Sequence, residues 1–287
     1  MDWGTSNVRV MRLAVGGRVL EERADPRGAG ELTSDAFAGV LEEVAGDWLA
    51  EAPVLICGMA GAKGRWLEAP YAPCPASLTD LAAALVRPDP KREVFIVPGV
   101  AEMGPGGLSD VMRGEETQMM GLMDAGVDGW AIAPGTHSKW VRLEIGRIAA
   151  FRTFATGELY AAVQEGTILT GGGTDTRPDD AAFRRGVERG LAEPALSAAL
   201  FSVRVGFLAG RLTPETAPDY LSGLLIGAEI AAQADEARGQ ALALIGAAAL
   251  TRRYARAMEI AGLGHADIHD AAEVTARGLW RIWEART

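Results

Sequence analysis

Short apolar runs and longer stretches with apolar residues every three or four positions alternate along the first hundred residues of the chain. The short runs predict β-strands, the first two as a hairpin, at residues 8–13, 18–23, 54–59 and 94–97. The periodic stretches predict helices, one from a cap at Thr33 or Ser34 to about Ala50 and one from a cap at Ser77 or Thr79 through Leu85. Alternating strands and helices favour an α/β sheet.

The remainder of the chain continues this alternation. Glycine and proline cluster at residues 104–107, after which Asp110 is expected to open a helix, carrying DVMRGEETQMMGLM, that connects two lobes. Further expected elements are a strand at 130–133, a helix ending near Gly166, a mobile loop at 171–180, helices within 181–208 and 220–237, a strand at 241–247, and helices at 250–261 and 270–283.

Two segments look like copies of one unit, DWGTSNVRVMRLAVGGRVLEE from Asp2 and APGTHSKWVRLEIGRIAAF from Ala133. Each places a Gly-Thr turn before an apolar run, then a turn with Gly-Arg and another apolar run. Turns rich in small and hydroxyl residues let backbone N–H groups approach a phosphate. We therefore expect a nucleotide cleft between an N-terminal lobe, residues 1–128, and a C-terminal lobe, residues 129–287.

Composition narrows the classes of function. The chain has 287 residues, 48% apolar and 23% charged, which is typical of a globular protein, and a formal net charge of −10 without a Lys/Arg block. Such a charge disfavours a nucleic-acid partner. The apolar run 241–250 is short of the roughly 20 residues of a membrane helix, so no membrane partner is expected. With no signal peptide at the start and two cysteines without CxxC spacing, we expect a cytoplasmic protein with free thiols, and a homo-oligomer stays open.

The first Gly-Thr turn carries candidate phosphate and metal ligands. Asp2 stands at a strand end beside Gly4, Thr5 and Ser6. Because Mg²⁺ prefers oxygen ligands and keeps several waters, Asp2 is a candidate for hydrated Mg²⁺, and the other three residues for phosphate oxygens. The fragment DxGT alone is weak and favours an ordinary Asx turn between strands.

The second Gly-Thr turn supplies the facing set, Gly135, Thr136, Ser138 and Lys139. Its lysine can neutralise a phosphate as a point charge. The alternative is a polar hairpin loop with a solvated lysine. The repeat of the first turn favours phosphate binding.

Carboxylates follow the glycine-rich cluster at Asp110, Glu115 and Glu116. A kinase that acts on an alcohol needs a base to accept the hydroxyl proton during phosphoryl transfer. Glu115 and Glu116 could equally form a solvated helix face, and both interpretations stay open.

The stretch FRTFATGEL offers groups for an acidic substrate. Arg152 could hold a carboxylate with two hydrogen bonds, and Thr153, Glu158 and His137 are further candidates. The alternative is helix capping by Thr156 with a surface ion pair. His265 and His269 are expected to be structural or solvated. Neither GxxxxGK[ST] nor GxGxxG occurs, so a Walker or Rossmann site is excluded.

These motifs together resemble the 2-dehydro-3-deoxygalactonokinase family, within the superfamily of sugar kinases, actin and heat-shock ATPases. The resemblance covers nearly the whole chain through DWGTSN, ICGM, EAPYAPCPASLTDLA, DVMRGEETQ, PGTHSKWV, FRTFATGEL, LFSVR, YLSGLLIGAE and LIGAAALTRRYARAM. It implies an α/β fold of the two-lobed actin-like ATPase type (ribonuclease H-like), with duplicated mixed sheets flanked by helices and a central nucleotide cleft. Members usually carry several apolar residues before the Asp of DWG, whereas Met1 alone precedes it here, so either the start is placed late or the first strand is truncated.

The resemblance also implies an activity: ATP-dependent phosphorylation of 2-dehydro-3-deoxy-D-galactonate, a small acidic sugar, to its 6-phosphate, with ATP and Mg²⁺. It implies Glu115 as base, with Glu116 and Asp110 as rivals, and Gly246 beside adenosine. Ala276 and Gly278 match the second connection between the lobes. Two alternatives stay open, an exopolyphosphatase-like phosphohydrolase of the same superfold and a nucleotide-gated actin-like binding protein without kinase activity.

Overall fold

The computed structural model describes residues 1–169 and 178–286, and the chain forms two compact units. Unit 1 comprises Met1–Ala131, Val141–Arg152 and His269–Thr287, and unit 2 comprises Ile132–Trp140 and Thr153–Ile268. Each unit is therefore built from separate parts of the chain, whereas the sequence suggested one boundary after residue 128. Most of the loop expected at 171–180 lies outside the described residues.

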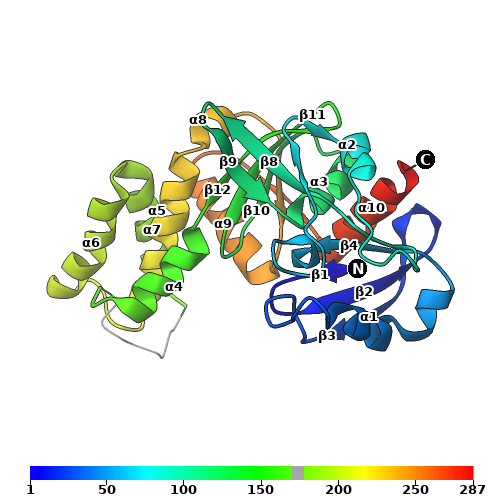
Figure 1. The fold of residues 1–287 in the computed structure, drawn as a ribbon. Coiled ribbons are helices and arrows are strands. Elements are labelled where there is room, and N and C mark those ends of the chain that lie inside the picture. Colours follow the sequence, from blue (N-terminus) through cyan, green and yellow to red (C-terminus); the bar gives the residue numbers. More distant parts are fainter. Residues whose placement is uncertain (170–177, 287) are drawn as a thin grey trace. The chain divides into compact units, whose positions relative to one another are not determined.

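The first sheet belongs to unit 1 and mixes parallel and antiparallel strands (Figure 1). Its strand order is β3 (Val19–Asp25), β2 (Val8–Leu13), β1 (Asp2–Trp3), β4 (Val54–Gly58) and β7 (Val94–Ile96). The expected hairpin is present as β2 and β3, and β1 pairs antiparallel with β2 and parallel with β4. Met1 extends the pairing of β1, because its carbonyl oxygen accepts a hydrogen bond of 3.0 Å from the Cys57 amide.

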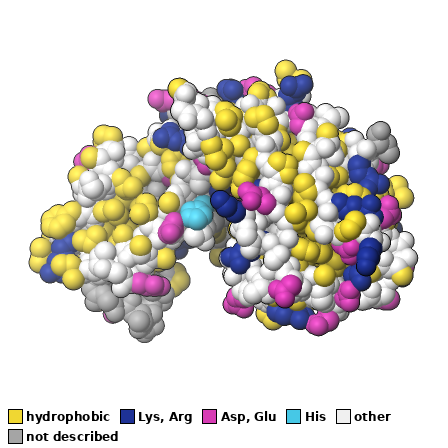
Figure 2. Space-filling model, viewed as in Figure 1, with side chains coloured by type: hydrophobic (Ala, Val, Ile, Leu, Met, Phe, Trp, Pro, Cys, Tyr) yellow, Lys and Arg dark blue, Asp and Glu magenta, His cyan; other side chains and the backbone are white. Residues whose placement is uncertain are grey.

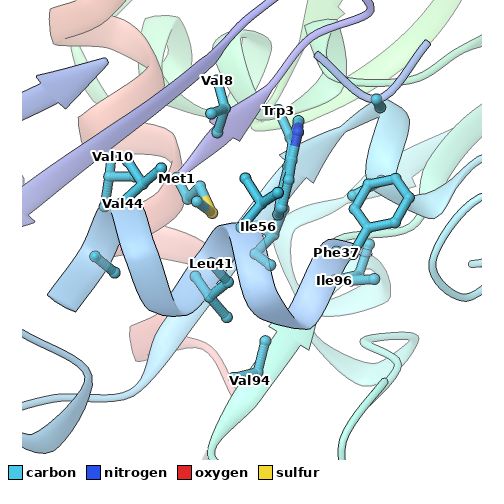
Figure 3. Close-up of a cluster of buried hydrophobic side chains, with 14 of the residues drawn as sticks. Met1, Trp3, Val8, Val10, Phe37, Leu41, Val44, Ile56, Val94 and Ile96 are labelled. Carbon is cyan, nitrogen blue, oxygen red and sulfur yellow. The ribbon is translucent and has the colours of Figure 1, made fainter. Parts of the chain in front are cut away.

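Helix α1 (Phe37–Ala45) covers this sheet and is shorter than the sequence indicated. Neither Thr33 nor Ser34 caps it, since Ser34 instead donates through its hydroxyl to the Trp66 carbonyl oxygen. The helix ends at Gly46, where φ is +55°, and a 3-10 turn (Gly46–Ala50) follows. Figure 3 shows side chains of α1 and of the strands meeting in one core, namely Met1, Trp3, Val8, Val10, Phe37, Leu41, Val44, Ile56, Val94 and Ile96.

A small sheet in unit 1 was not expected from the sequence. It has the order β5 (Tyr71–Pro73), β8 (Gly99–Gly104) and β9 (Gly107–Met112), with β8 and β9 forming a hairpin. Asp110 lies on β9 opposite Glu102, so the helix predicted from Asp110 was placed too early. Helix α3 (Glu115–Asp124) begins after Gly114, whose φ of +109° breaks the strand conformation and suits glycine.

Helices α3 and α10 (Ala271–Glu284) pack together at backbone distance within unit 1. A Cβ on Gly278 would lie 1.8 Å from the Thr117 carbonyl oxygen, and one on Gly121 would lie 1.9 Å from that of Val274. Asp270 caps α10 by accepting a hydrogen bond from the Glu273 amide at 2.9 Å. The glycines thus fix how closely α10 approaches the first turns of α3.

The third sheet contains the second copy of the repeated unit. Its order is β14 (Asp267–His269), β13 (Leu242–Ile245), β10 (Gly129–Ala133), β11 (Ser138–Glu144), β12 (Arg147–Phe154) and β6 (Ala76–Ser77). The hairpin of β11 and β12 follows β10 as the hairpin of β2 and β3 follows β1, which confirms the duplication inferred from the sequence. Short helix α2 (Leu78–Ala83) follows β6 and has the predicted cap, Ser77, in a reciprocal pair with Asp80.

Unit 2 is otherwise helical. Its helices are α4 (Thr156–Gly166), α5 (Asp180–Ala192), α6 (Leu196–Leu208), α7 (Ala217–Ala231), α8 (Ala234–Ala237) and α9 (Ala248–Ile260). Helices α5 and α7 contact through glycines, and a Cβ on Gly186 would lie 2.1 Å from the Tyr220 carbonyl oxygen. Helix α6 exposes Phe201, Val205 and Leu208, and Figure 2 shows apolar side chains gathered over this helix. Within the described ranges, no helix has the length and apolar character needed to cross a bilayer.

Candidate active site

The first candidate phosphate loop, residues Gly4–Ser6, follows β1 and exposes Thr5 and Ser6. The loop of residues 28–30 packs against its backbone. The amides of Ala29 and Gly30 donate to the carbonyl oxygens of Gly4 and Thr5 at 2.9 and 2.8 Å, and a Cβ on Gly28 would lie 2.1 Å from the Thr5 oxygen. This contact was not expected from the sequence, although the paired glycines of RGAG after the first hairpin are its signal.

Asp2 lies at the start of this loop, next to the end of β4. Its Oδ1 is 4.0 Å from Cys57 Sγ, and a Cβ on Gly58 would lie 3.4 Å from the same oxygen and 2.6 Å from the Trp3 carbonyl oxygen. Burial raises the pKa of Asp2, against the opposing effect of the N-terminal amine and Arg9. A buried carboxylate in its ionised form is stabilised by a bound hard cation, so the chemistry of Asp2 fits Mg²⁺.

Of the three candidate bases, Glu116 is buried, whereas Glu115 and Asp110 are half-buried. Glu116 is 0% exposed, with Oε2 accepting from the Gly114 amide at 2.6 Å and Oε1 from the Thr117 hydroxyl at 3.0 Å. Glu115 is half-buried, and its Oε2 accepts from the Arg113 amide at 3.1 Å. Asp110 accepts through Oδ1 from the Val111 amide at 2.7 Å, on the strand before the helix. Glu115 is the one of these three that is both in the first turn of α3 and half-buried.

The start of α3 lies close to the end of β4. A Cβ on Gly114 would lie 3.3 Å from Gly58 Cα, so any side chain at Gly114 would press on the strand that also borders Asp2. The structure therefore brings the candidate base and the candidate metal ligand to neighbouring strand and helix ends of unit 1.

Glu116 should make the stability of the protein depend on pH. Burial, with a smaller contribution from the charge of Glu115, raises the pKa of Glu116 to about 8. Between its ordinary pKa and this value the folded state holds a proton that the unfolded state releases, so the free energy of unfolding falls as pH rises, by about 5 kcal/mol at most. Glu116→Gln, which stays neutral, should remove this loss.

Urea unfolding of both proteins at pH 5.5 and pH 8.5 tests this expectation. The stability of Glu116→Gln relative to the native protein should increase clearly at the higher pH. A difference that stays constant between the two pH values would contradict a buried, neutral Glu116.

The second candidate phosphate loop lies in unit 2 between β10 and β11, with Thr136 and His137 exposed. The first turn of α4 contacts this loop. The Glu158 amide donates to the Thr136 carbonyl oxygen at 3.0 Å, and a Cβ on Gly157 would lie 2.5 Å from the Gly135 oxygen. His137 Nε2 and Glu158 Oε2 are 2.8 Å apart, so these two substrate candidates form an exposed pair.

The two polar residues that end this loop are buried, Ser138 at 0% and Lys139 at 5% exposure. The Ser138 hydroxyl donates to Glu229 at 2.7 Å, so its side chain is directed into unit 2. Lys139 is not the solvated lysine of the alternative interpretation. The exposed hydroxyl of the loop is that of Thr136.

Glu229 itself was missed by the sequence analysis. It is 2% exposed and accepts hydrogen bonds from four side chains of the described residues, those of Ser138, Trp140, Thr156 and Tyr254. Burial raises its pKa, and these hydrogen bonds oppose the increase. A lone glutamate within the apolar helix sequence LSGLLIGAEIA was the available signal.

Gly246 lies between β13 and α9, in unit 2. Its φ is +145°, and a Cβ there would lie 3.3 Å from the Pro134 carbonyl oxygen, at the start of the second phosphate loop. The following residues Ala247–Ala249 are exposed. The position expected to approach adenosine thus adjoins the loop expected to bind phosphate, and glycine is required there.

The remaining substrate candidates are divided between the units. Arg152 is exposed and ends a segment of unit 1, whereas Thr153 begins a segment of unit 2. His265 and Asp267 form a largely exposed pair 3.5 Å apart. In the part of the chain that the structure describes, no group of three or more His, Cys, Asp or Glu side chains is arranged to hold a metal ion.

A family model, a named relative and a solved structure all match nearly the whole of this chain. A family model described as 2-keto-3-deoxy-galactonokinase matches residues 2–282. A protein of Escherichia coli K12 named 2-dehydro-3-deoxygalactonokinase is 36% identical over 91% of this chain and 89% of its own. A crystal structure from Sinorhizobium meliloti carrying the same enzyme name superimposes with a TM-score of 0.87 at 37% identity, covering 99% of this chain and 97% of that one.

A more distant solved structure shares the fold alone. It is the activator of 2-hydroxyisocaproyl-CoA dehydratase from Clostridium difficile with bound ADPNP, which is 12% identical, with a TM-score of 0.52 over 99% of this chain and 94% of that one.

Proposed function

Since this chain belongs to the 2-keto-3-deoxy-galactonokinase family, we propose that it transfers the terminal phosphoryl group of ATP to the C6 hydroxyl of 2-dehydro-3-deoxy-D-galactonate. The products are ADP and 2-dehydro-3-deoxy-6-phospho-D-galactonate. The observation that carries the proposal within the site is the half-buried Glu115 in the first turn of α3, close to the strand that borders Asp2.

Glu115 acts in this proposal as the general base. As the C6 oxygen attacks the phosphorus atom, its proton passes to a Glu115 carboxylate oxygen, a contribution of about 10²- to 10⁴-fold. Arg113 and Gly114 hold the helix start, since the Arg113 amide donates to Glu115 and the Gly114 amide to Glu116. The enclosed Glu116 then serves to shape this turn.

The nucleotide is held by backbone and hydroxyl groups. Gly4, Thr5 and Ser6 from one loop and Gly135, Thr136 and Lys139 from the other would bind phosphate oxygens, while Gly246 leaves room for adenosine. Asp2 would hold Mg²⁺, which neutralises the charge that develops on the phosphates. Arg152 is our candidate for the sugar-acid carboxylate, with Thr153 and the pair His137 and Glu158 as further contacts. A reaction that consumes ATP points to the cytoplasm.

The proposal is tested by coupled ADP release with Mg-ATP, in the presence and absence of 2-dehydro-3-deoxygalactonate. Its gluconate-derived epimer and a simple aldonate are the controls. We expect strong stimulation by the galactonate-derived acid and appearance of its 6-phosphate. Phosphate release from polyphosphate without acid-dependent ADP formation would instead favour a phosphohydrolase, and slow ATP hydrolysis indifferent to the acid would favour a nucleotide-gated binding protein.

A further inference from the structure

The Glu229 carboxylate is the centre of a buried polar cluster on α7. Its Oε1 accepts from the Ser138 hydroxyl and from the Trp140 indole Nε1, each at 2.7 Å. Its Oε2 accepts from the Thr156 hydroxyl and, at 2.7 Å, from the Tyr254 hydroxyl. Each oxygen therefore uses both of its lone-pair directions, and these four donors are neutral groups.

Two of the donors lie next to the second phosphate loop, one directly after it in the chain and one at the start of the helix that contacts it. Ser138 directly follows the loop residues Gly135–His137. Thr156 is the first residue of α4, and the next two residues bear on the loop, with Gly157 against Gly135 and the Glu158 amide donating to the Thr136 oxygen. A shift of either donor would move the loop backbone.

The other two donors connect the same carboxylate to strand β11 and helix α9. Trp140 is 0% exposed on β11, two residues beyond Ser138. Tyr254 is on α9, the helix that begins two residues after Gly246. The carboxylate is thus bonded to the strand after the phosphate loop, to the helix that touches the loop, and to the helix that follows the candidate adenosine turn.

We propose that Glu229 is a positioning residue for nucleotide binding, whose carboxylate fixes the second phosphate loop by accepting hydrogen bonds from Ser138 and Thr156 at its two supports. The inference rests on the proposed function, in which this loop binds the phosphates of ATP. A carboxylate is suited to this position because it only accepts, so it directs all four donors toward one point.

Glu229→Gln changes this cluster with almost no change in volume. The amide oxygen keeps the side of Ser138 and Trp140, because the indole can only donate. The amide nitrogen then faces the Thr156 and Tyr254 hydroxyls, which must accept instead of donate or lose their hydrogen bonds. We expect isothermal titration of Mg-ATP, without any sugar acid, to give about tenfold weaker binding, and the KM for ATP to rise by a similar factor while kcat stays within about twofold.

The matched control is Tyr220→Phe, also on α7, which removes the hydrogen bond of 2.8 Å between the Tyr220 and Ser202 hydroxyls. It should lower the melting temperature without weakening Mg-ATP binding. If binding weakens equally in both variants for an equal loss of melting temperature, Glu229 is merely structural and the inference is overturned.

Thr156 provides a second variant in case Glu229→Gln does not fold. Thr156→Val keeps the shape and removes the hydroxyl, whereas Thr156→Ser keeps the hydroxyl. Weaker Mg-ATP binding in the valine variant that is restored in the serine variant supports the inference, and equal binding in both overturns it.

The outcome for the native protein separates the two proposals. If the native protein phosphorylates the sugar acid while Glu229→Gln and Thr156→Val bind Mg-ATP normally, only the role of Glu229 is lost. If the native protein binds no Mg-ATP, the proposed function fails and this inference fails with it.

Discussion

Glu115→Gln is expected to lower the turnover number by about 10²-fold or more while leaving Mg-ATP binding nearly unchanged. The amide has the shape of the carboxylate but cannot take the hydroxyl proton. The backbone hydrogen bond from Arg113 can still be accepted by the amide oxygen, so the first turn of α3 should be preserved. Steady-state kinetics with a coupled ADP assay, together with calorimetric titration of Mg-ATP, measure both quantities.

The rival carboxylates supply the comparison for this experiment. Glu116→Gln should retain most of the turnover, because Glu116 is enclosed and both its oxygens are used within the helix turn. Asp110→Asn should do the same, because Asp110 lies on β9. Normal turnover in Glu115→Gln, with a large loss in one of the other two variants, would transfer the role of base to that residue.

Gly278→Ala is expected to destabilise the protein by about 3 kcal/mol or more, or to prevent folding. The new methyl group would meet the Thr117 carbonyl oxygen at 1.8 Å, and because that oxygen belongs to the backbone of α3, the two helices would have to separate. Glu115 and Glu116 begin the same helix. Thermal or urea unfolding measures the loss.

Gly39→Ala is the matched control for a glycine in a helix. A Cβ on Gly39 would meet nothing within 4 Å, and its position in α1 is exposed. There alanine should stabilise by roughly 0.5–1 kcal/mol, because it loses less conformational freedom on folding. Equal effects of the two substitutions would contradict the close packing of α3 against α10.

The sequence predicted the repeated unit well because its signals are local. Alternating apolar residues bounded by glycine turns specify each hairpin without reference to the rest of the chain, and both hairpins are present. The actin-like ATPase fold that the motifs implied is likewise confirmed by the solved structures that share it. The cap at Ser77 was predictable for the same reason, since the Asp80 that completes it lies three residues later.

Predictions from the sequence were incomplete where the structure depends on contacts between segments that are far apart along the chain. The run from Asp110 has helix-forming residues, but pairing with β8 draws Asp110 into a strand and delays the helix to Glu115. The hydrogen bond between Ser138 and Glu229 could not be predicted from a local pattern, because the two residues are 91 positions apart along the chain. Gly28 packs against the loop of Gly4–Ser6, and the paired glycines of RGAG indicate a close backbone approach but not which segment they contact.

The surroundings of the two thiols bear on how this protein tolerates oxidants. Burial, with the nearby charges of Asp2 and Glu116, raises the pKa of the Cys57 thiol well above its ordinary value, and burial with Glu102 raises that of Cys74 to about 12. Peroxides and alkylating reagents attack thiolates, which both cysteines therefore lack at neutral pH. Burial, more than the neighbouring carboxylates, thus keeps both sulfur atoms as thiols, and we expect little loss of phosphoryl transfer on treatment with thiol-directed reagents.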